Sequence, residues 1–134
     1  MTSKKSFSIS LRISSKNMNC AGISEKLGWQ SSKQFERGDS FRSGAPSKTI
    51  REESLWIYDL PIDKKECFEE QIDKLVDMIL EKKTKFQEIL NECDLDIFCG
   101  YTTYNGQGGF ALRHGLMQEL SLLKIDLLVD FYSI

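Results

Sequence analysis

The sequence of 134 residues predicts an α+β fold, with helices packed on one face of a mostly antiparallel sheet of four or five strands, of the ferredoxin-like or split βαβ type. Segments with a strand-like apolar pattern alternate with segments of helical periodicity, in the order β-α-β-α-β-α-β. The length suits a single domain spanning residues 1–134. A doubly wound parallel sheet is the alternative, but it needs helices on both faces, for which the chain has little room.

The first half of the chain contains one strand, one helix and one long connection. Residues 7–13 alternate apolar and polar side chains, which predicts a half-buried strand. A helix is expected at residues 20–27, because Asn19 is a suitable N-cap, Gly28 is a suitable stop, and apolar side chains recur every three or four residues. Residues 30–53 are rich in Ser, Gly, Lys and Arg, so we expect a long loop there.

The second half contains the strongest helical pattern. Residues 63–93 place apolar side chains on one helical face and carboxylates on the other, and either one long helix or two helices with a break near residues 82–84 would fit. The last strand is expected at residues 126–132, and its nearly continuous apolar residues predict a central position in the sheet. The remaining expected elements are strands at residues 54–58 and 95–101 and a helix at residues 113–123.

The charge is unevenly distributed along the chain. Residues 1–54 carry ten Lys and Arg against five Asp and Glu, whereas residues 55–134 carry eight against fifteen, so a net of +5 is followed by a net of −7. This asymmetry is typical of a dipolar surface that orients a charged partner. The overall charge of −2 and the acids within the basic 30–53 segment argue against a nucleic-acid partner. No apolar run approaches the ~20 residues that a membrane span requires, so no membrane partner is expected.

The four cysteines indicate a reducing compartment. Their spacing contains no Cys-x-x-Cys pair, and His114 is the only histidine, so the sequence predicts neither a metal site nor a bound cofactor. Cysteines without such spacing are most simply buried thiols of a cytoplasmic protein. The chain also begins without the apolar segment of a signal peptide. The cysteines are Cys20, Cys67, Cys93 and Cys99.

Five segments in a consistent order carry a family resemblance, and they extend from about Ser6 to Tyr132. With these segments the chain resembles the bacterial "domain of unknown function 4279" family. The resemblance implies an α+β bacterial cytoplasmic protein and no particular activity. The segments are Phe7–Ile13, Ile23–Gly28, Phe35–Asp39, Leu55–Trp56 and Leu122–Tyr132.

No catalytic motif is recognisable, so we expect no enzyme. His114 is the only candidate base of its kind and no signature places a nucleophile beside it. A hydrolase would need a polar cleft containing His114 or Asp130. The leading hypothesis is a non-enzymatic bacterial binding protein, most concretely an immunity protein that occludes a cognate, basic toxin domain. Its expected contact surface is the acidic side of the long helical segment, formed by Glu66, Glu69, Glu70, Asp73 and Asp77.

The alternative hypothesis is a sensor domain for a small molecule or nucleotide of unknown identity. It would use the basic side chains of the 30–53 segment together with a glycine-rich stretch that precedes a helix, where free backbone N–H groups favour anions. The residues expected for this site are Arg37, Arg51 and Gly108. The stretch lacks the motif of a P-loop or a dinucleotide fold.

Overall fold

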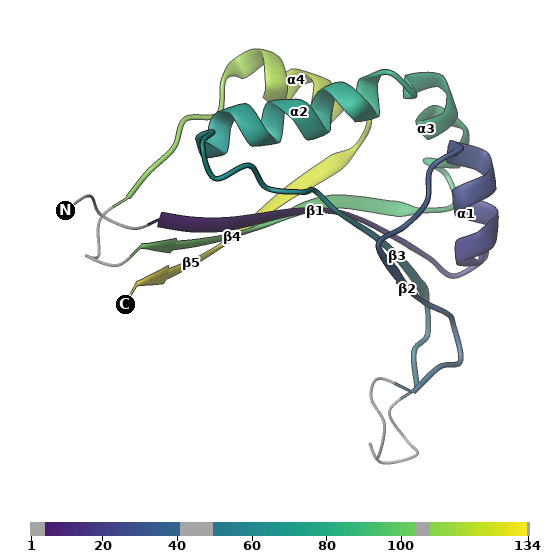
Figure 1. The fold of residues 1–134 in the computed structure, drawn as a ribbon. Helices are drawn as coiled ribbons and strands as arrows, with labels where there is room; N and C mark the ends of the chain where they lie inside the picture. The colour runs from purple at the N-terminus through teal and green to yellow at the C-terminus, as the bar shows by residue number, and fades with distance from the viewer. Residues whose placement is uncertain (1–4, 41–49, 104–107, 134) are drawn as a thin grey trace.

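The computed structural model describes residues 5–40, 50–103 and 108–133 (Figure 1). The strands are β1 (Lys5–Ser15), β2 (Lys33–Phe35), β3 (Ser54–Asp59), β4 (Asp94–Thr103) and β5 (Ile125–Ser133). The helices are α1 (Cys20–Leu27), α2 (Phe68–Leu80), α3 (Lys83–Ile89) and α4 (His114–Leu122).

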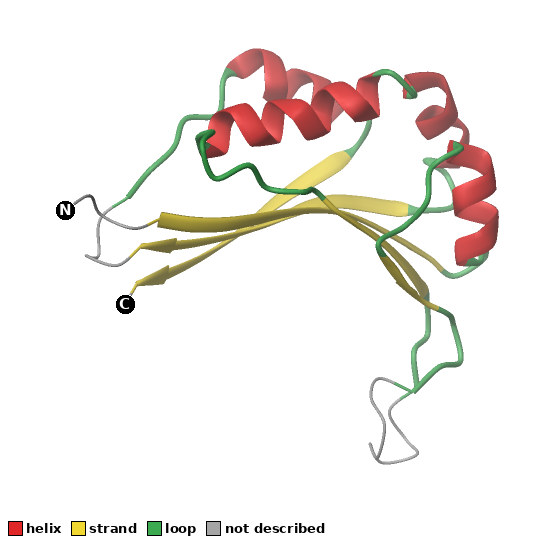
Figure 2. Cartoon of the chain, in the orientation of Figure 1, coloured by secondary structure: helices red, strands yellow, loops and turns green. Residues whose placement is uncertain are grey.

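The five strands form one sheet in the order β2-β3-β1-β4-β5. Among these strands, the pairs β2–β3, β3–β1 and β1–β4 are antiparallel, and the pair β4–β5 is parallel. All four helices lie on one side of this sheet (Figure 2). The α+β prediction with a mostly antiparallel sheet is therefore confirmed, and the doubly wound alternative does not apply.

The C-terminal strand occupies a different place from the one expected. β5 forms an edge of the sheet, and α4 carries the chain from β4 to β5. Because β4 and β5 are direct neighbours, no strand splits this βαβ unit. The prediction of a central final strand was wrong. Both faces of β5 carry apolar residues, but only one of these faces is covered by helices. Leu127 and Val129 pack toward the helices, whereas Leu128 lies exposed on the other face.

Helix α1 has the bounds that its capping residues predict. The Asn19 side chain accepts a hydrogen bond from the Gly22 backbone N–H at 2.7 Å, so one free donor of the first turn is satisfied. At the other end Gly28 adopts a left-handed conformation with φ 62° and ψ 38°, which glycine enters without the cost of a Cβ. Both signals act within a few residues, which explains why this helix is predictable from sequence.

The expected loop at residues 30–53 contains a strand. β2 pairs with β3, and Gln34 lies opposite Trp56. An isolated bridge between Ser40 and Ile50 extends the same hairpin beyond the sheet. Residues 41–49 of the expected loop lie outside the described residues.

The expected long helical segment forms two helices, because the chain turns at residues 81–82 between α2 and α3. Apolar side chains of α2, including Ile72, Leu75 and Ile79, are buried with the inward-facing residues of β1. None of the described helices is both long and apolar enough to cross a membrane.

Candidate functional site

None of the described helices covers the face of the sheet opposite to them (Figure 2). In Figure 1, β2 and β3 bend away from α2 and α4, so this face is concave. Because side chains alternate across a strand, every second residue of each strand lies on it. We call it the concave face. Its central members are Ser8, Ser10, Arg12, Lys33, Ile57, Asp59, Asp96, Phe98, Gly100, Asp126, Leu128, Asp130 and Tyr132.

Arg12 is held in one orientation on the concave face. Its Nε donates to Asp96 Oδ1 at 2.7 Å and its Nη2 donates to Asp96 Oδ2 at 3.0 Å, a bidentate geometry that restricts both side chains. The guanidinium carbon also lies 4.5 Å from the centre of the Phe98 ring. Both charged side chains keep part of their surface in solvent, at 30% and 26% exposure. An arginine already ordered in this way loses little further entropy when a partner binds.

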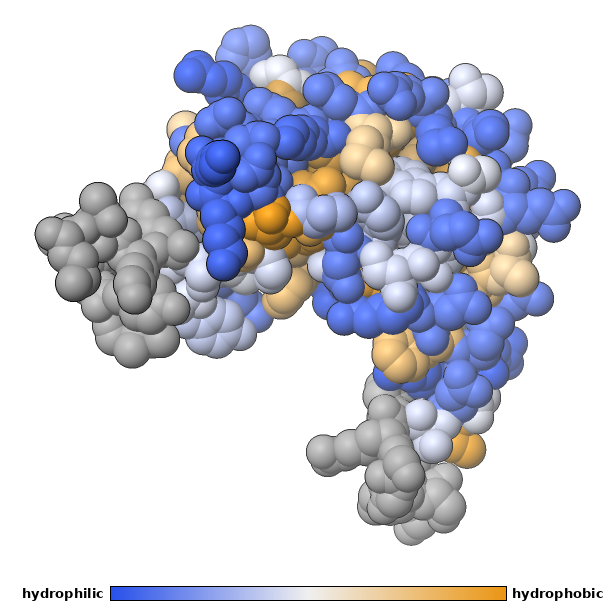
Figure 3. Space-filling view, viewed as in Figure 1, coloured by the Kyte–Doolittle hydropathy of each residue, from blue (hydrophilic) through white to orange (hydrophobic). Residues whose placement is uncertain are grey.

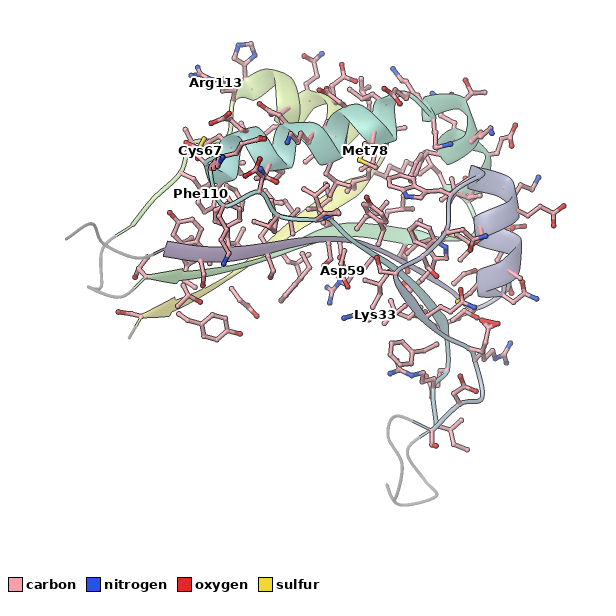
Figure 4. All side chains as sticks on the ribbon, viewed as in Figure 1. Lys33, Asp59, Cys67, Met78, Phe110 and Arg113 are labelled. Carbon is pink, nitrogen blue, oxygen red and sulfur yellow. The ribbon has the colours of Figure 1, made fainter. Side chains whose placement is uncertain are left out.

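A second ion pair lies beside the first. Ser10 Oγ donates to Asp59 Oδ1 at 2.6 Å, and Lys33 Nζ lies 3.6 Å from Asp59 Oδ2. Figure 4 shows Lys33 and Asp59 on the side of the sheet that faces away from the helices. Together with Arg12 and Phe98 these residues border an open hollow of about 460 Å³. The hollow is apolar at Phe98 and polar at its two ion pairs.

Gly100 keeps the floor of the concave face shallow. A Cβ at this position would lie 2.9 Å from Ser8 Oγ, closer than real Cβ atoms approach. A side chain here would therefore displace Ser8, its neighbour on β1. The result is a floor of small residues, Ser8 and Gly100, next to Asp130 of β5.

The concave face carries an excess of negative charge. Arg12 neutralises Asp96 and Lys33 neutralises Asp59. Asp126 and Asp130 also lie on this face, and neither has an ion-pair partner within the described residues. A partner that covers this face would therefore be favoured by positive charge.

The five carboxylates predicted for partner binding do lie along one side of α2 and the turn before it. Glu66 forms an ion pair with Lys74, and this hydrogen bond raises the pKa of Lys74. The thiol and backbone N–H of Cys67 donate to Glu70, which lowers the pKa of that carboxyl group.

Figure 3 shows a hydrophilic surface over α2. Glu69 is half-buried, whereas Asp73 and Asp77 are exposed. The structure therefore places the predicted residues together, and their role in binding stays a prediction.

The three residues predicted for the alternative ligand site do not share one pocket. Arg37 and Arg51 lie close together in the β2–β3 hairpin, where Gly38, next to Arg37, donates its N–H to the Arg51 carbonyl at 2.9 Å. The guanidinium carbon of Arg51 lies 4.1 Å from the centre of the Phe35 ring. Gly108 lies at the other end of β1. A Cβ on Gly108 would contact Thr103, and Thr103 pairs with Lys5, the first residue of that strand.

The candidate catalytic residues are also separated. His114 is exposed at the first residue of α4, on the helix side, whereas Asp130 lies on the concave face of β5. The two therefore do not line one cleft. Within the described ranges, no group of three or more His, Cys, Asp and Glu side chains is placed to hold a metal ion.

The cysteines follow the prediction of buried thiols at three of four positions. Cys20, Cys93 and Cys99 are buried and Cys67 is exposed, and all four are free. Burial raises the pKa of Cys20 and of Cys99 to about 12, and at Cys20 the hydrogen bond with Glu36 adds to the effect. Burial also raises the pKa of Cys93. These thiols are therefore protonated at neutral pH and serve as small apolar core residues.

The raised thiol pKa values predict a loss of stability in alkali. Below pH 9.0, the ordinary pKa of a thiol, these thiols are protonated in both the folded and the unfolded chain. Their full contribution to the free energy of unfolding is therefore present there. As the pH rises from 9.0 toward about 12, the unfolded chain loses protons that Cys20 and Cys99 retain when folded, and the free energy of unfolding falls. Urea unfolding at a series of pH values measures this slope. Cys99→Ala is expected to reduce the slope, and an unchanged slope would contradict the assignment.

Comparisons with known proteins identify the family. No curated protein and no solved structure matches the chain. The family model for a domain of unknown function, DUF4279, matches residues 5–134, which is nearly the whole chain and agrees with the resemblance found in the sequence. The protein therefore belongs to the DUF4279 family.

Proposed function

We propose that the protein is a non-enzymatic binding protein, most concretely an immunity protein that occludes a cognate toxin domain. The observation that carries this proposal is the concave face, an uncovered sheet surface on which charged and aromatic side chains are already ordered. The Arg12–Asp96 pair stacked on Phe98 is its clearest element.

The chemistry of the concave face suits a protein partner. Arginine and aromatic side chains are the types that contribute most to binding energy when a partner excludes water from them. On this face Arg12 and Phe98 form one unit, and Tyr132 is 56% exposed. Because the side chains of the concave face are already ordered, they lose little conformational entropy when this face binds a convex protein surface.

The charge of two surfaces favours a basic partner. Asp126 and Asp130 give the concave face a negative excess, and Asp73 and Asp77 are exposed on α2. A basic cleft, such as the active site of a nuclease toxin, would be attracted by both surfaces. Such attraction raises the rate of association and falls as salt increases.

A cytoplasmic location is part of this proposal. The four cysteines are free, and three of them are buried where an oxidant has little access. Thiols of this kind persist in a reducing compartment.

The decisive experiment has two stages. Tagged protein captures partners from lysate of the source cells at low salt, and the partner is then purified and titrated against the chain by calorimetry. We expect a stoichiometric complex whose affinity falls with salt. Phe98→Ser is expected to weaken binding by about tenfold or more, because a central aromatic contact contributes at least ~1.4 kcal/mol. Co-expression of the partner with the chain should restore the growth of cells that the partner alone arrests.

Matched variants separate the two candidate surfaces. Asp77→Lys tests the acidic side of α2, and Glu88→Lys makes the same charge change at an exposed position of α3. Binding that falls with Asp77→Lys and not with Phe98→Ser would move the contact to α2. If a purified partner binds all three variants like the parent, or if co-expression does not restore growth, the immunity hypothesis fails.

A further inference from the structure

The outer edge of β5 is open to another strand. β5 is a nine-residue edge strand, and within the described part of the chain no strand pairs with its outer side. The opposite edge strand, β2, has only three residues. A long edge strand presents a row of unpaired N–H and C=O groups that serves as a template for pairing with another chain.

Most of the exposed large apolar side chains belong to β5 or to α4, the helix that precedes it. Six large hydrophobic side chains are exposed in the described ranges, and five of them belong to α4 or β5. Phe131 is the most exposed of them, at 62%. Its ring stacks on Phe110 at a centroid distance of 5.8 Å and lies at the same distance from the Tyr101 ring, so these two contacts leave most of it exposed. The five are Met117, Leu122, Leu128, Phe131 and Tyr132.

An open apolar pocket lies beside the first half of β5. It has a volume of about 330 Å³ and lies between α4 and β5. Its apolar walls include Leu112, Met117 and Leu127, and Ser121, Lys124 and Asp126 also line it. Phe131 projects from the second half of β5 on the same, helix-covered face as Leu127, because both occupy odd positions of the strand.

We propose that two copies of this chain form a symmetric dimer by antiparallel pairing of their β5 strands, with Val129 opposite the Val129 of the second copy. In this register all nine residues of β5 find a partner in the second copy. A twofold contact of this kind is self-complementary, since each residue repeats its contact on the other copy.

The carboxylates on β5 favour this register over those centred on the two neighbouring residues. With Val129 at the centre, Asp126 lies opposite Tyr132 and Asp130 lies opposite Leu128, so no two carboxylates face each other. Centring the pair on Leu128 would place Asp126 opposite Asp130, and centring it on Asp130 would place that carboxylate opposite itself. Like charges directly opposite one another destabilise a strand pair.

The same register fills the apolar pocket. Phe131 of one copy lies opposite Leu127 of the other, and directly opposed Cβ atoms are about 5 Å apart. The exposed ring of Phe131 therefore covers the pocket that Leu127 and Met117 line, and the symmetry repeats this contact. Because the strands are antiparallel, the two α4 helices lie at opposite ends of the pair and do not compete for space.

Sedimentation and light scattering over a concentration series test the dimer. We expect the purified full chain to have twice the mass of one chain. Phe131→Ser and Met117→Ser are each expected to raise the dimer dissociation constant by about tenfold or more. Leu122→Ser is the matched control, because Leu122 is 57% exposed on α4 but does not line the pocket, and its dimer should be unchanged.

A cross-link tests the register directly. In a Cys67→Ser background, Val129→Cys should give a disulfide-linked dimer on oxidation, because the two thiols face each other across the twofold axis. Ser133→Cys should not, since Ser133 lies opposite Ile125. A monomer at all concentrations, an unlinked Val129→Cys protein, or a dimer that tolerates both pocket variants would overturn the proposal. A strand of another protein bound to β5, with the purified chain itself monomeric, would also overturn the proposal.

Discussion

Replacing Trp56 with alanine is expected to lower the free energy of unfolding by about 3–5 kcal/mol, the usual cost of truncating a buried tryptophan. Trp56 is fully buried at 0% exposure, and its indole N–H donates to Ser24 Oγ at 2.9 Å. Its ring also packs edge-on against Trp29 at 5.9 Å. One side chain thus joins β3, α1 and the segment after α1. Denaturant unfolding followed by far-UV circular dichroism measures the effect without relying on tryptophan fluorescence.

Trp56→Phe separates packing from hydrogen bonding. It keeps most of the buried apolar surface but removes the donor to Ser24, so we expect a loss of about 1–2 kcal/mol. This milder variant also provides a measurement if Trp56→Ala does not fold. A loss below about 1 kcal/mol for Trp56→Ala would contradict the assignment of Trp56 to the core.

Phe68→Ala is expected to have a similar effect at the other end of the sheet, again about 3–5 kcal/mol. Phe68 is the first residue of α2 and is 3% exposed. Its ring centre lies 5.6 Å from that of Phe7 and 5.7 Å from that of Tyr101, and 4.2 Å from that of Phe110. This cluster joins α2, the sheet and the chain that leads into α4. Figure 4 shows Phe110 near the start of α2.

Phe98→Ala is the matched control for Phe68→Ala. It makes the same truncation on the concave face, where the ring is half-exposed and contacts Arg12, and we expect a loss of about 1 kcal/mol. Both variants are measured by urea unfolding under the same conditions. Equal losses for the two variants would show that the aromatic cluster around Phe68 does not stabilise the fold as inferred.

Elements with strong local signals were predictable from the sequence. The alternation in β1 and the caps of α1 depend only on residues a few positions apart. β2 was missed, because Lys33, Gln34 and Phe35 carry no pattern of their own and become a strand only by pairing with β3. The turn between α2 and α3 was left open, because helical apolar patterns flank the polar residues 81–85 on both sides, and one long helix or two helices fit them.

The concave face was not predicted, although one signal for it existed. The even positions of β1 are polar from Ser8 to Arg12, which indicates that one face of this strand does not enter the core. The identity of the neighbours was not readable. Arg12 and Asp96 are separated by 84 positions in the chain, and no local pattern indicates that they form a bidentate pair.

By itself, the sequence determined the fold class, the bounds of α1, most of the strands and the polar character of one side of α2. These features follow from side-chain periodicity and from capping, which act over a few residues. Only the tertiary structure decided the strand order, the edge position of β5, the separation of Gly108 from Arg37 and Arg51, and the composition of the concave face. Those features depend on which distant segments pair, and pairing is selected by burial and register over the whole chain.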